Sequence, residues 1–134
     1  MLTVAVWLAR ACFIVLLGVL AFFSLVSADN EMNISQFIPW DKASHFISYF
    51  LLTLVGILAF PSVPLIVIGV AILAQSALVE AVQPYVGRSR DLYDLMANAL
   101  GISGVLAPVV VFRLREFVKQ RRRLNLEAAL GDRS

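Results

Sequence analysis

Four long apolar runs constrain this chain more than any other feature, at about 11–28, 43–60, 63–79 and 95–112. Each has 17 or 18 residues, so a helix that rises ~1.5 Å per residue would cross roughly 27 Å of lipid. Because lipid offers the backbone no hydrogen bonds, such runs must be helices. The alternating pattern typical of a membrane barrel is absent from the sequence. The sequence therefore predicts an all-α, four-helix transmembrane bundle.

Composition excludes a water-soluble domain. Of the 134 residues, 60% are hydrophobic and 15% are charged, and the mean hydropathy is +0.87. Runs this long would leave large exposed apolar patches on any soluble fold of this size. We predict one transmembrane domain over 1–112, followed by a basic tail over 113–134. The single cysteine excludes an intramolecular disulfide.

Basic residues predict the orientation. Seven of the 11 Lys and Arg residues lie in 113–134, whereas loops 29–42 and 84–90 carry only Lys42, Arg88 and Arg90. Cytoplasmic segments carry the excess of Lys and Arg, so we predict a cytoplasmic C-terminus and N-terminus, with both loops outside. We expect the tail to contact anionic lipid and not nucleic acid, since no folded module for reading nucleic acid accompanies its charges.

Two short segments refine this topology. Residues Pro61-Ser62-Val63-Pro64 predict a tight turn between the second and third spans, because the residue before a proline avoids the helical region. Val26-Ser27-Ala28 fits a signal-peptidase site. Cleavage there is an alternative that would remove the first span and leave the other three in the same orientation.

Polar residues gather in three short stretches, each at the end of an apolar run, and the topology puts all three at the outer face. In two of the stretches, helical spacing places the polar residues on one side of the helix. We therefore predict a ligand-binding site in which the members of all three stretches approach one another. Its residues are Asp41, Lys42, His45, Tyr49, Glu80, Gln83, Arg88, Asp91, Asp94 and Asn98.

These side chains offer several kinds of chemistry. Arg88 and Arg90 could bind phosphate or carboxylate bidentately, and Asp41 could orient His45 one turn away. His45, Glu80 and Asp94 are the candidate catalytic residues. A histidine with carboxylates could hold a divalent cation, but no recognised metal or nucleotide motif is present, so we predict no metal and no cofactor.

The candidate site residues also have a purely structural interpretation. The carboxylates at positions 41, 91 and 94 lie where negative charge stabilises a helix N-terminus. Asn98 could simply join two helices within the membrane.

The three stretches resemble the motifs of the VanZ-like family, named for a bacterial membrane protein of teicoplanin resistance. The matching segments are 41–52, 80–83 and 87–101, and the resemblance spans 41–104, about half of the chain. The chain departs from the family pattern in two places: the stretch between Gln83 and Arg88 is about one residue short, and the second glycine falls at Gly104 rather than at position 105. The resemblance implies a multi-pass protein of the bacterial cytoplasmic membrane with no agreed reaction, and for some members a role in lipoglycopeptide susceptibility.

Three hypotheses follow. The first is a membrane module that recognises an anionic envelope headgroup or peptidoglycan precursor at its outer face. The second is a membrane-embedded hydrolase or transferase acting on lipid-linked phosphate, so the sequence leaves open whether the chain is an enzyme. The third is a structural partner in a larger envelope complex. The expected partners are membrane lipids, a lipid-linked precursor or lipoglycopeptide, and a second copy of the chain.

Overall fold

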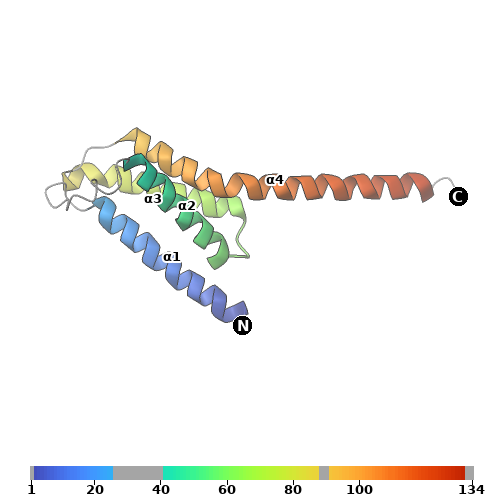
Figure 1. The fold of residues 1–134 in the computed structure, drawn as a ribbon, viewed down its shortest axis with the longest axis horizontal. Coiled ribbons are helices and arrows are strands. Elements are labelled where there is room, and N and C mark those ends of the chain that lie inside the picture. Colours follow the sequence, from blue (N-terminus) through green and yellow to red (C-terminus); the bar gives the residue numbers. More distant parts are fainter. Residues whose placement is uncertain (1, 26–40, 88–90, 132–134) are drawn as a thin grey trace.

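The computed structural model describes residues 2–25, 41–87 and 91–131, and over these residues the protein is helical throughout apart from short turns (Figure 1). Four α-helices follow one another along the chain, with one 3-10 helix after the third. They are α1 (Leu2–Leu25), α2 (Asp41–Ala59), α3 (Leu65–Val82), η3 (Gln83–Val86) and α4 (Leu92–Gly131). All four α-helices are long and apolar enough to cross a membrane, which confirms the predicted all-α, four-helix transmembrane fold.

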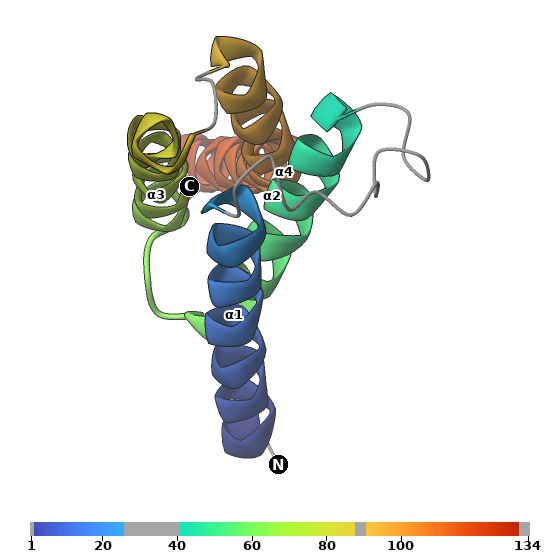
Figure 2. The same cartoon turned by 90° about the vertical axis from the view of Figure 1, so that its left-hand side faces the viewer.

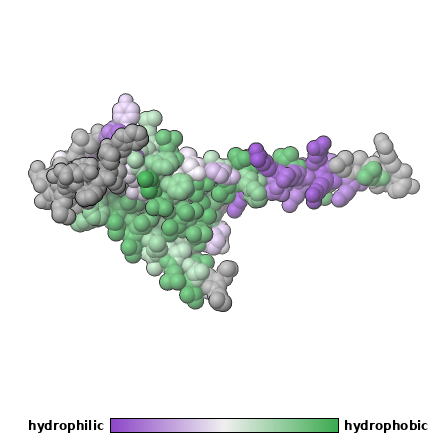
Figure 3. Space-filling model, viewed as in Figure 1, coloured by the Kyte–Doolittle hydropathy of each residue, from purple (hydrophilic) through white to green (hydrophobic). Residues whose placement is uncertain are grey.

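Two helices are longer than the apolar runs predicted. α1 begins at Leu2 rather than at 11, and α4 continues through Pro108 to Gly131 rather than ending at 112. The predicted spans ended at charged residues, and charge interrupts an apolar run without interrupting a helix, because Arg, Lys and Glu are good helix formers. Residues 113–131 therefore extend α4 away from the bundle, and this part is mostly hydrophilic whereas the bundle surface is apolar (Figures 1 and 3).

α2 contacts each of the other three helices and α4 most extensively, whereas α3 packs mainly on α4 (Figure 2). The fully buried centre of the bundle is formed by side chains of α2, α3 and α4, and apolar side chains of α1 pack against it. This centre consists of Tyr49, Leu52, Ile68, Ile72 and Ile102. The remaining apolar side chains point outward, as expected for helices that face lipid.

One end of the bundle is held by a charged residue and a turn. The Arg10 Nε donates a hydrogen bond of 3.1 Å to the carbonyl oxygen of Ala59, the last residue of α2. Helix C-termini leave such carbonyls without intrahelical partners and favour a nearby cation. The predicted turn at 61–64 is confirmed: the Val63 amide donates to the Phe60 carbonyl, and Pro64 caps α3. Arg10 therefore ties α1 to the end of α2 that leads into this turn.

The backbones of α2 and α4 approach each other closely at Gly101. A Cβ placed there would lie 2.4 Å from the Phe46 carbonyl oxygen and 3.0 Å from the Phe50 amide nitrogen, both backbone atoms of α2. At Gly104, one turn further along α4, the nearest atom is a Phe50 ring carbon at 3.4 Å. Gly101 thus allows the α2 and α4 backbones to touch, whereas Gly104 makes an ordinary van der Waals contact.

We predict that Gly101→Ala separates α2 from α4 and destabilises the bundle by about 1–3 kcal/mol, the usual cost of overpacking. Thermal unfolding in detergent, followed by the fraction of monodisperse protein, measures this. Gly104→Ala is the matched control, because its methyl group has room and alanine favours the helix. Equal unfolding temperatures for the two variants would contradict the role given to Gly101.

Candidate functional site

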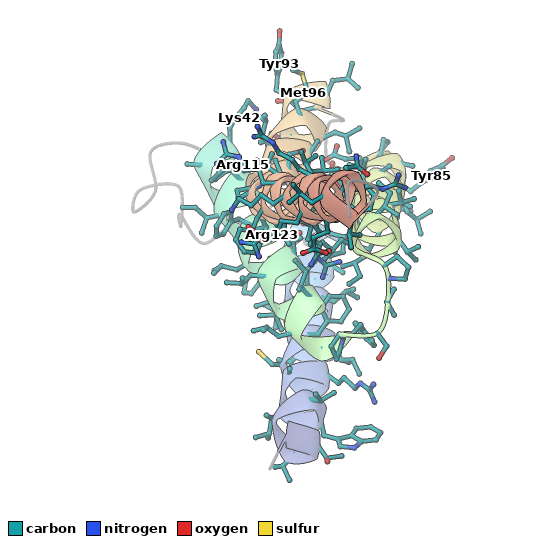
Figure 4. The ribbon with its side chains drawn as sticks, turned by 90° about the vertical axis from the view of Figure 1, so that its right-hand side faces the viewer. Lys42, Tyr85, Tyr93, Met96, Arg115 and Arg123 are labelled. Atoms are coloured by element: carbon teal, nitrogen blue, oxygen red, sulfur yellow. The ribbon has the colours of Figure 1, made fainter. Side chains whose placement is uncertain are left out.

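Lys42, in the first turn of α2, lies beside the start of α4 and binds two of its carboxylates (Figure 4). The Lys42 Nζ is 2.6 Å from Asp91 Oδ2 and 2.8 Å from Asp94 Oδ1. A cation near a helix N-terminus is disfavoured by the helix dipole, and these two carboxylates compensate for it. One lysine therefore joins α2 to α4 at the end of the bundle opposite Arg10.

One turn further into α2, His45 faces the same two turns of α4. Its Nδ1 lies 3.1 Å from Asn98 Oδ1, and its Nε2 lies 3.6 Å from Asp94 Oδ2. Because an amide oxygen only accepts, the contact with Asn98 requires the proton to be on Nδ1. The separation from Asp94 is longer than a hydrogen bond, so Nε2 is the less tightly held nitrogen.

Asn98 also forms a hydrogen bond with α3. Its Nδ2 donates a hydrogen bond of 2.7 Å to Ser76 Oγ, and the Asn98 side chain is almost wholly buried, at 2% exposure. Six residues from three helices are thereby linked in one continuous set of contacts. We refer to them as the polar cluster: Lys42, His45, Ser76, Asp91, Asp94 and Asn98.

Glu80 lies at the edge of the polar cluster and is buried, with 6% exposure. The backbone amide of Asp91 donates to Glu80 Oε2 at 3.5 Å, the long end of the hydrogen-bond range. The helix dipole disfavours a negative charge near a helix C-terminus, so this carboxylate needs compensation from a favourable partner. The start of α4 supplies part of it, because helix N-termini favour negative charge.

Asp91 caps α4. Its Oδ1 accepts a hydrogen bond of 2.8 Å from the Tyr93 amide, while its other oxygen receives Lys42. The hydrogen bond from Lys42, and after it the Tyr93 amide, hold the pKa of the Asp91 carboxyl below its usual value. Because this pKa is lowered in the folded state, the cap and ion pair contribute above about pH 4 and are lost only on further acidification.

A second polar contact lies deeper in the bundle. The Tyr49 hydroxyl donates to Gln75 Oε1 at 3.1 Å, and the Thr53 hydroxyl donates to the Tyr49 carbonyl at 2.7 Å. Beside Thr53 on α2, Leu52 packs with Ile72 and Ile102 in the buried apolar core. Among the described residues, no buried side-chain nitrogen or oxygen lacks a hydrogen-bond partner. The buried polar groups of the described residues therefore have hydrogen-bond partners, and the apolar core closes the polar region on one side. The polar region is not part of a continuous polar path through the described part of the bundle.

The structure brings together most, but not all, of the predicted site residues. His45, Asp94 and Asn98 meet directly, and Glu80 reaches them through the Asp91 amide. Gln83 points elsewhere: its Nε2 donates to the Ser24 carbonyl of α1 at 3.4 Å. Arg88, Arg90 and the side chain of Asp41 lie outside the described residues, so their predicted roles stay predictions.

Sequence reasoning missed Gln75. Its amide lies inside an apolar run, as that of Asn98 does, so the same argument from an uncompensated polar group would have found it. Thr53 could not be found by this argument, because its hydroxyl donates a hydrogen bond to a carbonyl of its own helix and needs no partner on another helix. In the part of the chain that the structure describes, no group of three His, Cys, Asp or Glu side chains is placed to hold a metal ion.

Comparison with protein-family models, with curated proteins and with solved structures finds no match to this chain. The functional argument therefore depends on the geometry of the polar cluster and on the sequence motifs that form it.

We predict that Asn98→Ala destabilises the protein by about 1–3 kcal/mol, because it leaves Ser76 and the Nδ1 of His45 without their partner in a buried site. The measurement is again thermal unfolding in detergent. Asn125→Ala is the control, since Asn125 is exposed on the same helix. An unfolding temperature equal to that of the control would show that Asn98 does not hold the three helices together.

Proposed function

We propose that this chain is a VanZ-like integral membrane protein of the bacterial cytoplasmic membrane. Its polar cluster, together with Arg88 and Arg90, would recognise the anionic headgroup of an envelope lipid or lipid-linked peptidoglycan precursor at the outer face, with the two arginines contacting the phosphate. One observation supports this proposal most: the buried polar atoms of the cluster all have hydrogen-bond partners, and an apolar core lies between the cluster and the other end of the bundle. A blind polar site at one end of a bundle suits a headgroup whose lipid tail stays in the membrane, and does not suit a pore.

Exposure supports a site that is entered from the end of the bundle. The side chains of Lys42 and Asp91 are 47% and 36% exposed, whereas those of His45 and Asp94 are 14% and 11% exposed. The most exposed members are thus the first that a ligand would meet. A deeper, rigid layer of hydrogen-bonded residues supports them.

The phosphate contacts are assigned to the two arginines. Lys42 is already paired with both Asp91 and Asp94, and one lysine cannot neutralise two carboxylates and also attract an anion. Arg88 and Arg90 come directly before Asp91 in the sequence, and guanidinium groups bind phosphate bidentately. In this proposal Asp94, Asn98 and Glu80 organise the site without contacting the phosphate.

The orientation and the phenotype are part of the same proposal. The excess of Lys and Arg at 113–134 supports a cytoplasmic C-terminus, which puts the polar cluster on the outer side. Envelope precursors are exposed there, and so is any lipoglycopeptide that binds them. Contact with such a precursor would connect the protein to lipoglycopeptide susceptibility.

We predict that Arg88→Gln lowers the affinity for polyprenyl phosphate at least about tenfold, the usual loss when one charge-assisted phosphate contact is removed. The measurement is binding to purified protein in phosphatidylcholine nanodiscs. Arg115→Gln is the matched control, because Arg115 lies on the α4 extension, 21 residues beyond Asp94 along the same helix. The proposal fails if the two variants bind equally well and both are as stable as the unmodified protein.

A hydrolase or transferase acting on lipid-linked phosphate is the second candidate function. The observation in its favour is that His45 Nε2 and Asp94 Oδ2 lie 3.6 Å apart, so a phosphoryl oxygen or water that approaches both atoms from the side could exchange a proton with His45. It predicts that the purified protein releases phosphate from polyprenyl diphosphate and that His45→Gln removes this activity while leaving binding intact. Absence of turnover in the unmodified protein would leave recognition as the function.

A further inference from the structure

The side of α4 that faces away from the bundle carries a seven-residue repeat over nearly its whole length. The spacing alternates strictly between three and four residues, from the first turn of α4 to Leu124 in its extension. The side chains at these positions are all exposed. They are Tyr93, Met96, Leu100, Ser103, Ala107, Val110, Leu114, Phe117, Arg121 and Leu124.

This repeat is separate from the face that builds the bundle. The buried residues of α4 are at 94, 97, 98, 101, 102 and 105, and Tyr93 and Met96 point away from the other three helices (Figure 4). The repeat therefore belongs to a surface that the bundle does not use. We call this surface the outer seam.

The outer seam continues past the membrane. About 20 helical residues cross the hydrocarbon, so a span that starts at Leu92 ends near 112. Leu114, Phe117 and Leu124 lie beyond that point and are 58%, 55% and 62% exposed. Lipid tails can cover the first half of the seam but not this half, so its apolar side chains need a different cover.

From the outer seam we infer that a second copy of this chain covers it, as a parallel α4–α4 coiled coil. Two copies in one membrane share their orientation, so the two seams meet in parallel and in register. Apolar residues with a seven-residue period drift around a straight helix, and supercoiling of two helices keeps them in contact. A helix lying flat on a membrane would instead keep a period of 3.6 residues and would have to leave the course that Figure 1 shows.

The area of the outer seam and the positions of its charged residues both agree with a second copy of the chain as the partner. The apolar side chains of the seam expose roughly 800 Å², about what one partner contributes to an interface of standard size. Arg115, Lys119, Arg122 and Arg123 fall at positions that point away from a coiled-coil partner. Arg121 is the one charge on the seam, and its guanidinium lies 5.4 Å from the centre of the Phe117 ring. A single charged residue at such a position fixes register at a cost in stability.

Disulfide cross-linking in native membranes tests the inference. The chain has one cysteine, so Cys12→Ser provides a background in which each added cysteine reports on itself. Under mild oxidation, Leu114→Cys on the seam is expected to form a covalent dimer at least about tenfold faster than Lys119→Cys on the opposite side. Equal rates at both positions would indicate random collision, and no cross-link at either would indicate a monomer. Either result overturns the inference.

Three further variants in the Leu114→Cys background identify what covers the seam. Phe117→Glu is expected to abolish the cross-link, and Arg121→Leu is expected to accelerate it by removing the charge. Reversing Arg115 and Arg123 to Glu should leave it unchanged, because these residues point outward. If that reversal abolishes the cross-link while Phe117→Glu does not, an anionic surface covers the helix and the inference is wrong. All of these positions lie outside the bundle core, so unfolding temperatures should stay within about 2 °C of the background.

Discussion

The direct contact between the backbones of α2 and α4 at Gly101 is the constraint on which the rest of the structure depends. Side-chain packing alone keeps helix axes about 8–10 Å apart, and glycine allows a closer approach. Gly101 lies one turn after Asn98 and two turns after Asp94 on α4, and Phe46 directly follows His45 on α2. The two helices thus approach each other closely beside the point where short polar side chains must meet. Without that approach, His45 and Asn98 could not share a 3.1 Å hydrogen bond.

The polar cluster illustrates how a membrane protein stabilises a polar region with partners on different helices. Each described helix that reaches it contributes groups that need partners, and each such group finds one on a different helix. Lys42 and His45 come from α2, Ser76 from α3, and Asp94 and Asn98 from α4. Because the partners are on different helices, satisfying the hydrogen bonds also fixes the arrangement of the bundle. The residues proposed to organise a ligand are therefore also residues that hold the fold.

The sequence predicted this arrangement well where one physical rule decided the outcome. The absence of hydrogen-bonding partners in lipid determined the helices, and the rarity of polar residues identified Lys42, His45, Asp94 and Asn98. Prediction from the sequence failed where several structures would satisfy the same physical rule. Gln83 has the spacing of a site residue but finds its partner in the Ser24 carbonyl of α1, and only the packing of α1 reveals that. Likewise, charge at 113–123 ended the apolar run without indicating whether the helix ended too.

The continuity of α4 has a mechanical consequence. Asp94 in the polar cluster and Leu124 near the other end belong to the same helix, 30 residues and ~45 Å apart. A tilt of about 5° at the cluster would displace the far end by about 4 Å, because a helix of this kind moves as a lever. Pro108, between the two ends, lacks an amide proton and is the point where such a lever bends most easily. An event at one side of the membrane thus has a direct physical route to the other side through a single element of structure.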